Sequence, residues 1–184
     1  GRYTGVAGAT VCDIAAIGYY APGPGATAPL PAPLGHYVGV TGAGVATPAA
    51  AGYYVGITGA TASVACLAGT YSGGSAASAC TPAPAGWFAA GSAATAAVPC
   101  SPGRYSAATG ATACAVADPG YYVATTGSTA QVAAAAGYFV GSAGANAPVA
   151  APIGFYVAVT AATAPVPCPA GSQSFGASIA CRDT

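Results

Sequence analysis

The sequence predicts an all-β and irregular fold: an elongated solenoid of 17-residue tandem repeats stapled by disulfides. Three observations predict it. A glycine followed two residues later by an aromatic residue returns every 17 residues along most of the 184-residue chain. Gly and Pro recur too often for stable helices, in spite of the many alanines. The seven cysteines occupy only two positions of the repeat.

Repeats of fixed length indicate a repeat architecture, and we therefore treat residues 1–184 as a single array. The ten full repeats begin at Gly1, Gly18, Gly35, Gly52, Gly69, Gly86, Gly103, Gly120, Gly137 and Gly154. A shorter last repeat spans residues 171–184, and it has Gln173 in place of the aromatic residue.

Each repeat is predicted to form a strand, a turn, a second strand and a Pro/Ala linker. The opening segment, Gly-Tyr-Tyr-Val at 52–55 for example, is aromatic and β-branched, as strands are. The eighth position is usually glycine, as at Gly8, Gly42 and Gly110, which suits a tight turn. Repeats close with a stretch such as residues 81–85, in which proline favours extended geometry. We expect the aromatic residues to form the core or a seam between subunits.

The cysteines predict three disulfides. Each cysteine at the fifteenth position of a repeat is followed by one at the twelfth position of the next, and at the other junctions both are absent. Cys181 matches the twelfth position if the short last repeat has lost one residue. Two cysteines that are bonded to each other are expected to be present together or absent together at a junction. The predicted pairs are Cys66 with Cys80, Cys100 with Cys114, and Cys168 with Cys181. A closed loop of about 15 residues contributes roughly 3 kcal/mol in the chain-entropy model.

Cys12 remains without a partner, because its counterpart would lie in a repeat before Gly1. An odd cysteine indicates an upstream segment or an intermolecular bond, and a buried free thiol is the alternative. A zinc site is the competing use of paired cysteines. It requires four ligands, but the chain has no Cys-x-x-Cys pair and His36 is distant in sequence from every cysteine. We therefore expect no metal and no cofactor.

Hydroxyl side chains recur at the seventh and tenth positions. Dense Thr and Ser among Pro and Ala suggest O-linked glycosylation, and the alternative is that the hydroxyls bond nearby backbone in turns. The only asparagine, Asn146, lacks the N-glycosylation pattern. The candidate O-glycosylation sites are Thr10, Thr27, Thr41, Thr58, Thr61, Thr95, Thr109, Thr112, Thr126, Thr129, Thr160 and Thr163.

Composition argues against several classes of function. Three basic residues cannot neutralise a run of phosphates, so a nucleic-acid partner is not expected. Gly, Pro, Ser or Thr interrupts every apolar stretch before the roughly 20 residues of a spanning helix, so membrane insertion is not expected. One His, three Asp and no Glu or Lys leave little from which to build a catalytic site. Arg104 and Asp118 are one candidate ion pair.

Several segments resemble ephrin-receptor-like cysteine-rich repeats. They are Gly-Thr-Tyr-Ser at 69–72 leading to Ala-Cys-Thr-Pro at 79–82, the run 103–114, and Pro-Cys-Pro-Ala-Gly at 167–171. Such repeats build elongated extracellular stalks, and similar ones occur in large secreted surface proteins, including those of flagellar hair filaments (mastigonemes). The resemblance covers the chain by period, but most repeats lack the two cysteines of a full family repeat.

The expected function is therefore structural and not enzymatic. Disulfides indicate an oxidising compartment, so we expect an extracellular or cell-surface location. With no net charge to oppose association, the leading hypothesis is a glycan-bearing subunit that associates with itself in a filament, surface appendage or sheath. A receptor or adhesin stalk that presents a binding domain outside this segment is the second hypothesis. An ice-binding protein with regular threonine arrays is the third.

Overall fold

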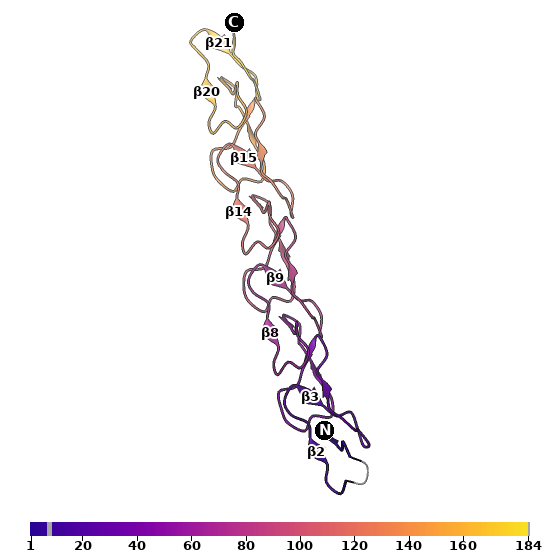
Figure 1. The fold of residues 1–184 in the computed structure, drawn as a ribbon. Helices are drawn as coiled ribbons and strands as arrows, with labels where there is room; N and C mark the ends of the chain where they lie inside the picture. Colours follow the sequence, from indigo (N-terminus) through magenta and orange to yellow (C-terminus); the bar gives the residue numbers. More distant parts are fainter. Residues whose placement is uncertain (7–8, 184) are drawn as a thin grey trace. The chain divides into compact units, whose positions relative to one another are not determined.

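The computed structural model describes residues 1–6 and 9–183, so Gly8 lies outside the described residues. That part of the chain contains 22 strands of two residues each and no helix, which confirms the all-β prediction (Figure 1). The strands pair into antiparallel hairpins, one in each repeat. The same repeat therefore gives the same local structure along the described chain.

The hairpins are distributed over two compact units, described separately below. Compact unit 1 comprises residues 1–6, 9–83 and 89–97, and compact unit 2 comprises residues 84–88 and 98–183. The hairpins of compact unit 1 are β1 (Arg2–Tyr3) with β2 (Asp13–Ile14), β3 (Tyr19–Tyr20) with β4 (Leu30–Pro31), β5 (His36–Tyr37) with β6 (Thr47–Pro48), β7 (Tyr53–Tyr54) with β8 (Val64–Ala65), and β9 (Thr70–Tyr71) with β10 (Thr81–Pro82). Those of compact unit 2 are β11 (Trp87–Phe88) with β12 (Val98–Pro99), β13 (Arg104–Tyr105) with β14 (Ala115–Val116), β15 (Tyr121–Tyr122) with β16 (Val132–Ala133), β17 (Tyr138–Phe139) with β18 (Val149–Ala150), β19 (Phe155–Tyr156) with β20 (Val166–Pro167), and β21 (Ser172–Gln173) with β22 (Arg182–Asp183).

The second strand of each hairpin lies in the stretch that the sequence predicts as a linker. In the full repeats, position 2 faces position 14 and position 3 faces position 13, as in Tyr19 opposite Pro31. The N–H of Ala32 donates to the carbonyl of Gly18 at 2.8 Å, so the neighbouring pair Tyr19 and Pro31 is the non-hydrogen-bonded one. Proline therefore removes no bond from this hairpin. The predicted linker is therefore shorter than expected: in the stretch 81–85, Thr81–Pro82 form the second strand and residues 83–85 connect to the next repeat. Proline is compatible with this position of the strand.

A tight turn joins each hairpin to the next repeat. The N–H at position 2 donates to the carbonyl three residues before it, as from Tyr121 to Asp118 at 3.0 Å. The intervening glycine, at position 1, has φ between 79° and 89° from Gly18 to Gly171. A β-turn with positive φ at its third residue has the form of type II, which favours proline one residue earlier, as at Pro102 and Pro119.

Backbone hydrogen bonds connect successive repeats. The N–H of Gly35 donates to the carbonyl of Val55 in the next repeat, and the N–H of Val38 donates to Ala60, both at 2.9 Å. A further bond reaches back two repeats, from the N–H of Gly42 to the carbonyl of Ala15 at 2.7 Å. Equivalent bonds recur in both compact units, so the stacking of one repeat on the next depends chiefly on backbone hydrogen bonds.

The core consists of small side chains at three positions of the repeat, positions 1, 4 and 15. Position 1 is glycine, and position 4 is mainly valine or alanine, such as Val123 and Val140. Position 15 is alanine or cysteine, such as Ala134. The core alternative is wrong for the second position, where Trp87 and Tyr138 are each 38 % exposed. Aromatic residues at the third position are half-buried, and Tyr37 packs against the core residues Val55 and Ala60. The alternative of a seam between subunits stays a prediction. Because backbones from different repeats approach closely at positions 1 and 15, the interior has no room for rings.

The eighth position adopts a left-handed conformation whether or not it is glycine. Gly127 and Gly144 have φ of 74° and 76°, and Ala76, Ala93 and Ala161 have φ of 60°, 56° and 56°. An L-residue in this region costs roughly 1–2 kcal/mol. The turn prediction is thus confirmed, and it extends to repeats in which alanine replaces glycine.

Replacing Ala93 with glycine should stabilise the protein by about 0.5–1 kcal/mol, because relief of the left-handed strain exceeds the added freedom of the unfolded chain. Chemical denaturation would measure the change. Ala94→Gly is the control, since Ala94 does not have a positive φ. That substitution should destabilise by a similar amount. Equal effects of the two would contradict the assignment of strain to Ala93.

Candidate functional site

Three disulfides join consecutive repeats, and they link the pairs that the sequence predicts. Cys66 is bonded to Cys80, Cys100 to Cys114, and Cys168 to Cys181, each with a Cα–Cα distance of 5.7 Å. The first cysteine of each pair directly follows a second strand, and its partner directly precedes the second strand of the next repeat. Identical backbone positions therefore place the sulfur atoms within bonding reach at all three junctions.

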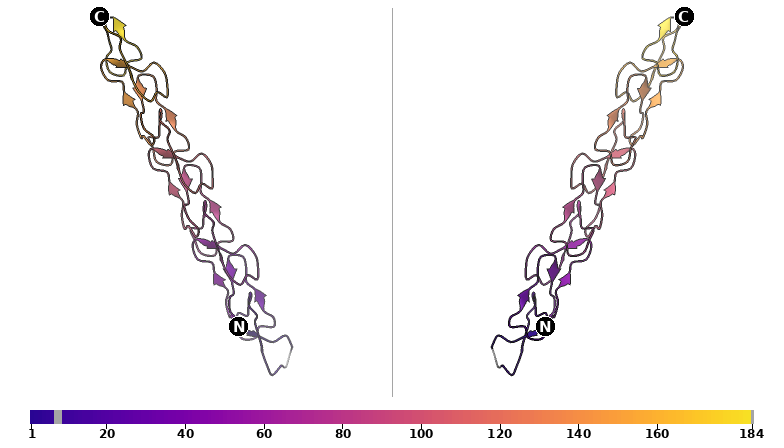
Figure 2. Two further views of the ribbon diagram at one scale, coloured as in Figure 1. Left: turned by 90° about the vertical axis from the view of Figure 1, so that its left-hand side faces the viewer. Right: turned by 90° about the vertical axis from the view of Figure 1, so that its right-hand side faces the viewer.

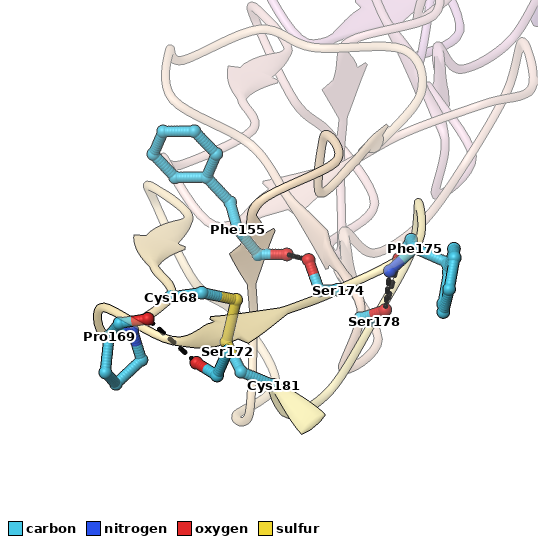
Figure 3. The surroundings of a disulfide bond; sticks show 8 residues. All are labelled: Phe155, Cys168, Pro169, Ser172, Ser174, Phe175, Ser178 and Cys181. Carbon is cyan, nitrogen blue, oxygen red and sulfur yellow. Dashed lines mark hydrogen bonds between the residues drawn. A yellow bond between two sulfur atoms is a disulfide. The ribbon is translucent and has the colours of Figure 1, made fainter. Parts of the chain in front are cut away.

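The last disulfide shows how hydroxyl groups support a junction (Figure 3). Ser172 Oγ donates to the carbonyl of Pro169 at 2.9 Å, in the turn after Cys168. Ser174 is buried, and its hydroxyl donates at 2.6 Å to the carbonyl of Phe155 in the preceding repeat. Ser178 Oγ donates to the carbonyl of Phe175. The short last repeat is thus attached covalently and by polar contacts.

A polar clasp, not anticipated from the sequence, occupies one junction without cysteines. The backbone N–H of Asp118 donates to Gln131 Oε1, and Gln131 Nε2 donates to Asp118 Oδ2, both at 2.7 Å. Gln131 has the position that Cys114 has one repeat earlier. The predicted Arg104–Asp118 pair is not observed within compact unit 2, where Arg104 Nη1 instead donates to the carbonyl of Cys114 at 3.4 Å.

The double substitution Ala117→Cys and Gln131→Cys should form a fourth disulfide, because these residues are equivalent to Cys100 and Cys114. We expect a gain of about 2 kcal/mol on oxidation: roughly 3 kcal/mol for the closed loop, less about 1 kcal/mol for the lost clasp. The oxidised and reduced forms of the variant can be compared by denaturation. Failure to oxidise would show that this junction differs in backbone geometry.

Cys12 is exposed, which makes the buried-thiol alternative wrong. It lies beside an open groove of about 450 Å³ that Arg2, Thr4 and residues 23–26 also line. Its twelfth position is the one that elsewhere bonds to the preceding repeat. The structure describes no partner for this thiol.

The twelve candidate glycosylation residues share two properties. All twelve side chains are exposed, and none has a hydrogen-bond partner within its own compact unit. Other hydroxyls do bond nearby backbone: Thr70 Oγ1 donates to Leu67, and the buried Ser72 and Ser106 donate to carbonyls two residues later. The turn-closing interpretation therefore applies to those residues and is wrong for the twelve. They are Thr10, Thr27, Thr41, Thr58, Thr61, Thr95, Thr109, Thr112, Thr126, Thr129, Thr160 and Thr163.

Large apolar side chains are exposed in nine of the ten full repeats, all but the repeat 69–85, and chiefly on the hairpins. At position 2, Tyr19 is 42 % exposed and Phe155 36 %. At position 13, exposed fractions lie between 46 % and 55 % for Leu30, Val64, Val98, Val132, Val149 and Val166. Scattered exposed apolar residues are ordinary, but exposure at the same positions in repeat after repeat indicates an interaction surface.

Two equivalent open grooves lie between neighbouring hairpins. One, of about 400 Å³, adjoins the Cys100–Cys114 disulfide and is lined by Phe88, Val98, Pro99 and Arg104. The other adjoins Cys66–Cys80 and is lined by Tyr54, Leu67 and Thr70. Both are mainly apolar, and neither contains a nucleophile placed beside a base.

Ionisable side chains do not gather into a site in the described ranges. Among residues 1–6 and 9–183, no three His, Cys, Asp or Glu side chains come together as they would to hold a metal. His36 Nδ1 lies 3.2 Å from the carbonyl oxygen of Leu34. Over those same residues, no helix is long and apolar enough to span a bilayer.

Comparison with known proteins gives no relative: the chain matches no family model and no curated protein sequence.

Proposed function

We propose that this chain is a structural subunit of an extracellular filament, surface appendage or sheath, and that it associates with copies of itself. The observation that supports this most directly is the repeated exposure of large apolar side chains on a chain with three basic and three acidic residues. An apolar, uncharged surface gains free energy when a similar surface covers it. Such a role needs no catalytic group and no cofactor.

The disulfides support the extracellular part of the proposal. Such bonds persist in oxidising environments and are rare where thiols are kept reduced. The resemblance to ephrin-receptor-like repeats points the same way, and that relationship is itself part of the proposal. The spacing of Cys100 and Cys114 is one of the features on which this resemblance rests.

Sedimentation of the oxidised protein tests the proposal. Over the range from about 1 to 100 µM, a self-associating subunit forms assemblies whose mass rises with concentration, by mass action. Electron microscopy of the same samples would show filaments or sheets. A protein that sediments as a monomer over the whole range would contradict the proposal.

The proposal includes O-linked glycans on the twelve threonines. Their exposed hydroxyls, free of backbone partners within their own compact units, support attachment, and sugars would hydrate a surface that has almost no charge. Protein secreted from a eukaryotic host should carry mass increments of whole sugar residues, and chemical release of O-glycans should remove them. Thr109→Ala with Thr112→Ala should reduce the increments, whereas Thr70→Ala should not, because the Thr70 hydroxyl bonds Leu67. An unmodified mass would contradict this part alone.

A further inference from the structure

Four hairpins of compact unit 2 each present an apolar pair on one face of the hairpin. Residues directly opposite each other on an antiparallel pair project to the same side. Positions 3 and 13 are opposite in four of its hairpins, where an aromatic residue faces a valine: Phe88 and Val98, Tyr122 and Val132, Phe139 and Val149, and Tyr156 and Val166. We call these four pairs the aromatic–valine face. Its valines remain 47–55 % exposed although each lies opposite a ring.

These pairs return on the same side of the unit after three repeats. In Figure 1, β14 and β20, which belong to repeats three apart, have equivalent places in compact unit 2, and so do β15 and β21. In both views of Figure 2, the arrows that mark the strands of compact unit 2 recur in the same order along the chain. The Phe88–Val98 and Phe139–Val149 pairs are likewise three repeats apart, and we therefore assign them to one side.

From this arrangement we infer that the aromatic–valine face is the lateral contact between copies of this chain, hairpin against hairpin. The inference rests on the proposed function and deepens it by naming the surface and its occupant. A second copy is the occupant because its pairs have the same 17-residue spacing. When one pair meets its counterpart, the pair three repeats away meets its own counterpart as well.

Charge also favours a second copy over other partners. The charged residues of compact unit 2 are Arg104, Asp118, Arg182 and Asp183, and all lie outside the four pairs. Arg104 does lie beside one pair, in the groove that Phe88 and Val98 also line. A highly charged protein or a nucleic acid would lose hydration over the rest of this face without gaining opposite charges. Another copy brings an equally apolar face.

The strand edge indicates that side chains make the contact, not added strands. Because Cys100 donates its N–H to Gly86, the neighbouring pair, Trp87 and Pro99, is the non-hydrogen-bonded one. The nitrogen of residue 99 therefore points away from the hairpin, and as a proline it has no hydrogen to donate. Pro167 has the same position in β20. Proline at such an edge prevents strand addition at β12 and β20, whereas β16 and β18 have Ala133 and Ala150 at that position.

The area predicts an extended assembly and not an isolated dimer. A whole aromatic side chain buries about 150–250 Å², so a partly covered pair leaves on the order of 100 Å² available. Two pairs on one side fall well below the roughly 800 Å² per partner of a stable interface. Association through this face therefore requires several neighbours at once, as in lateral packing, where linked weak contacts act together.

The double variant Val98→Asp and Val149→Asp tests the face on one side. Position 13 is aspartate in the first repeat, at Asp13 in β2, so a hairpin accepts the residue there. The matched control is Ile153→Asp with Val159→Asp, which adds the same charge at side chains that are 77 % and 65 % exposed and outside the strands. Both variants and the unsubstituted protein are compared by sedimentation, after thermal unfolding has verified that they are folded.

The unsubstituted protein should assemble, and the Val98/Val149 variant should need at least about a tenfold higher concentration, because charges in several linked contacts act together. The control should assemble within about threefold of the unsubstituted protein. If assembly persists and the two variants behave alike, the face is not the contact while the proposed function stands. If the unsubstituted protein stays monomeric, both proposals fail. Should the aspartate variant not fold, Val98→Thr with Val149→Thr replaces it, since Thr47 and Thr81 occupy the same position in β6 and β10.

Discussion

Replacing Gly120 with alanine should destabilise the protein by about 3 kcal/mol or more. A Cβ atom added at Gly120 would lie 2.3 Å from the carbonyl oxygen of Ala161, two repeats further on. That oxygen belongs to the backbone, so one of the two backbone segments must shift, and overpacking of this kind costs roughly 1–3 kcal/mol. The φ of 87° at Gly120 adds about 1–2 kcal/mol for any L-residue. Denaturant unfolding of the oxidised protein measures the sum.

Gly154→Ala separates the two contributions. Gly154 has the same place in its repeat and a φ of 82°, but a Cβ atom added there meets no atom within 4 Å. This variant should lose only the conformational part, about 1–2 kcal/mol. Equal losses for Gly120→Ala and Gly154→Ala would mean that the close approach of the two backbones contributes nothing.

Removing the Cys100–Cys114 disulfide should cost about 3 kcal/mol. The bond closes a loop between residues separated by 14 positions, for which the chain-entropy model gives that magnitude. Replacing both cysteines with alanine keeps packing comparable, because Ala83 and Ala97 occupy the same two positions at another junction. Unfolding by denaturant under oxidising conditions measures the difference.

Cys12→Ala is the control for the disulfide prediction. It removes a cysteine that is exposed and free, so the unfolding midpoint should not change. A loss below about 1 kcal/mol for the double alanine variant would show that neighbouring repeats already hold the loop closed in the unfolded ensemble.

The features that depend on repeat register could be predicted from the sequence. The joint presence of Cys66 and Cys80, and the joint absence of cysteine at other junctions, identifies partners without any knowledge of the backbone. The first strand and the turn at the eighth position follow from residue types with strong local preferences. Such preferences depend on residues that are close together in the sequence, so the sequence alone is enough to predict these elements.

Contacts between distant backbones could not be predicted in the same way. The approach of Gly120 to Ala161 involves carbonyl and Cα atoms, so the side chains leave little trace of it. The only trace is the restriction of positions 1, 4 and 15 to small residues, which composition alone explains equally well. Aromatic residues are therefore the natural expectation for a core or a seam between subunits, whereas the interior holds residues such as Ala134 and Val140. The Asp118–Gln131 clasp was missed because both residues lack a repeated pattern.

The contact between Gly120 and Ala161 also determines the order in which the repeats can fold during synthesis. The two residues are 41 positions apart, so a repeat has its last neighbour only when that much more chain is available. Three consecutive repeats are therefore the smallest segment in which a first-position glycine has all its contacts. A nascent chain would acquire structure in steps of one repeat, always about two repeats behind the growing end. The most recently made part of the protein is thus always its least ordered part.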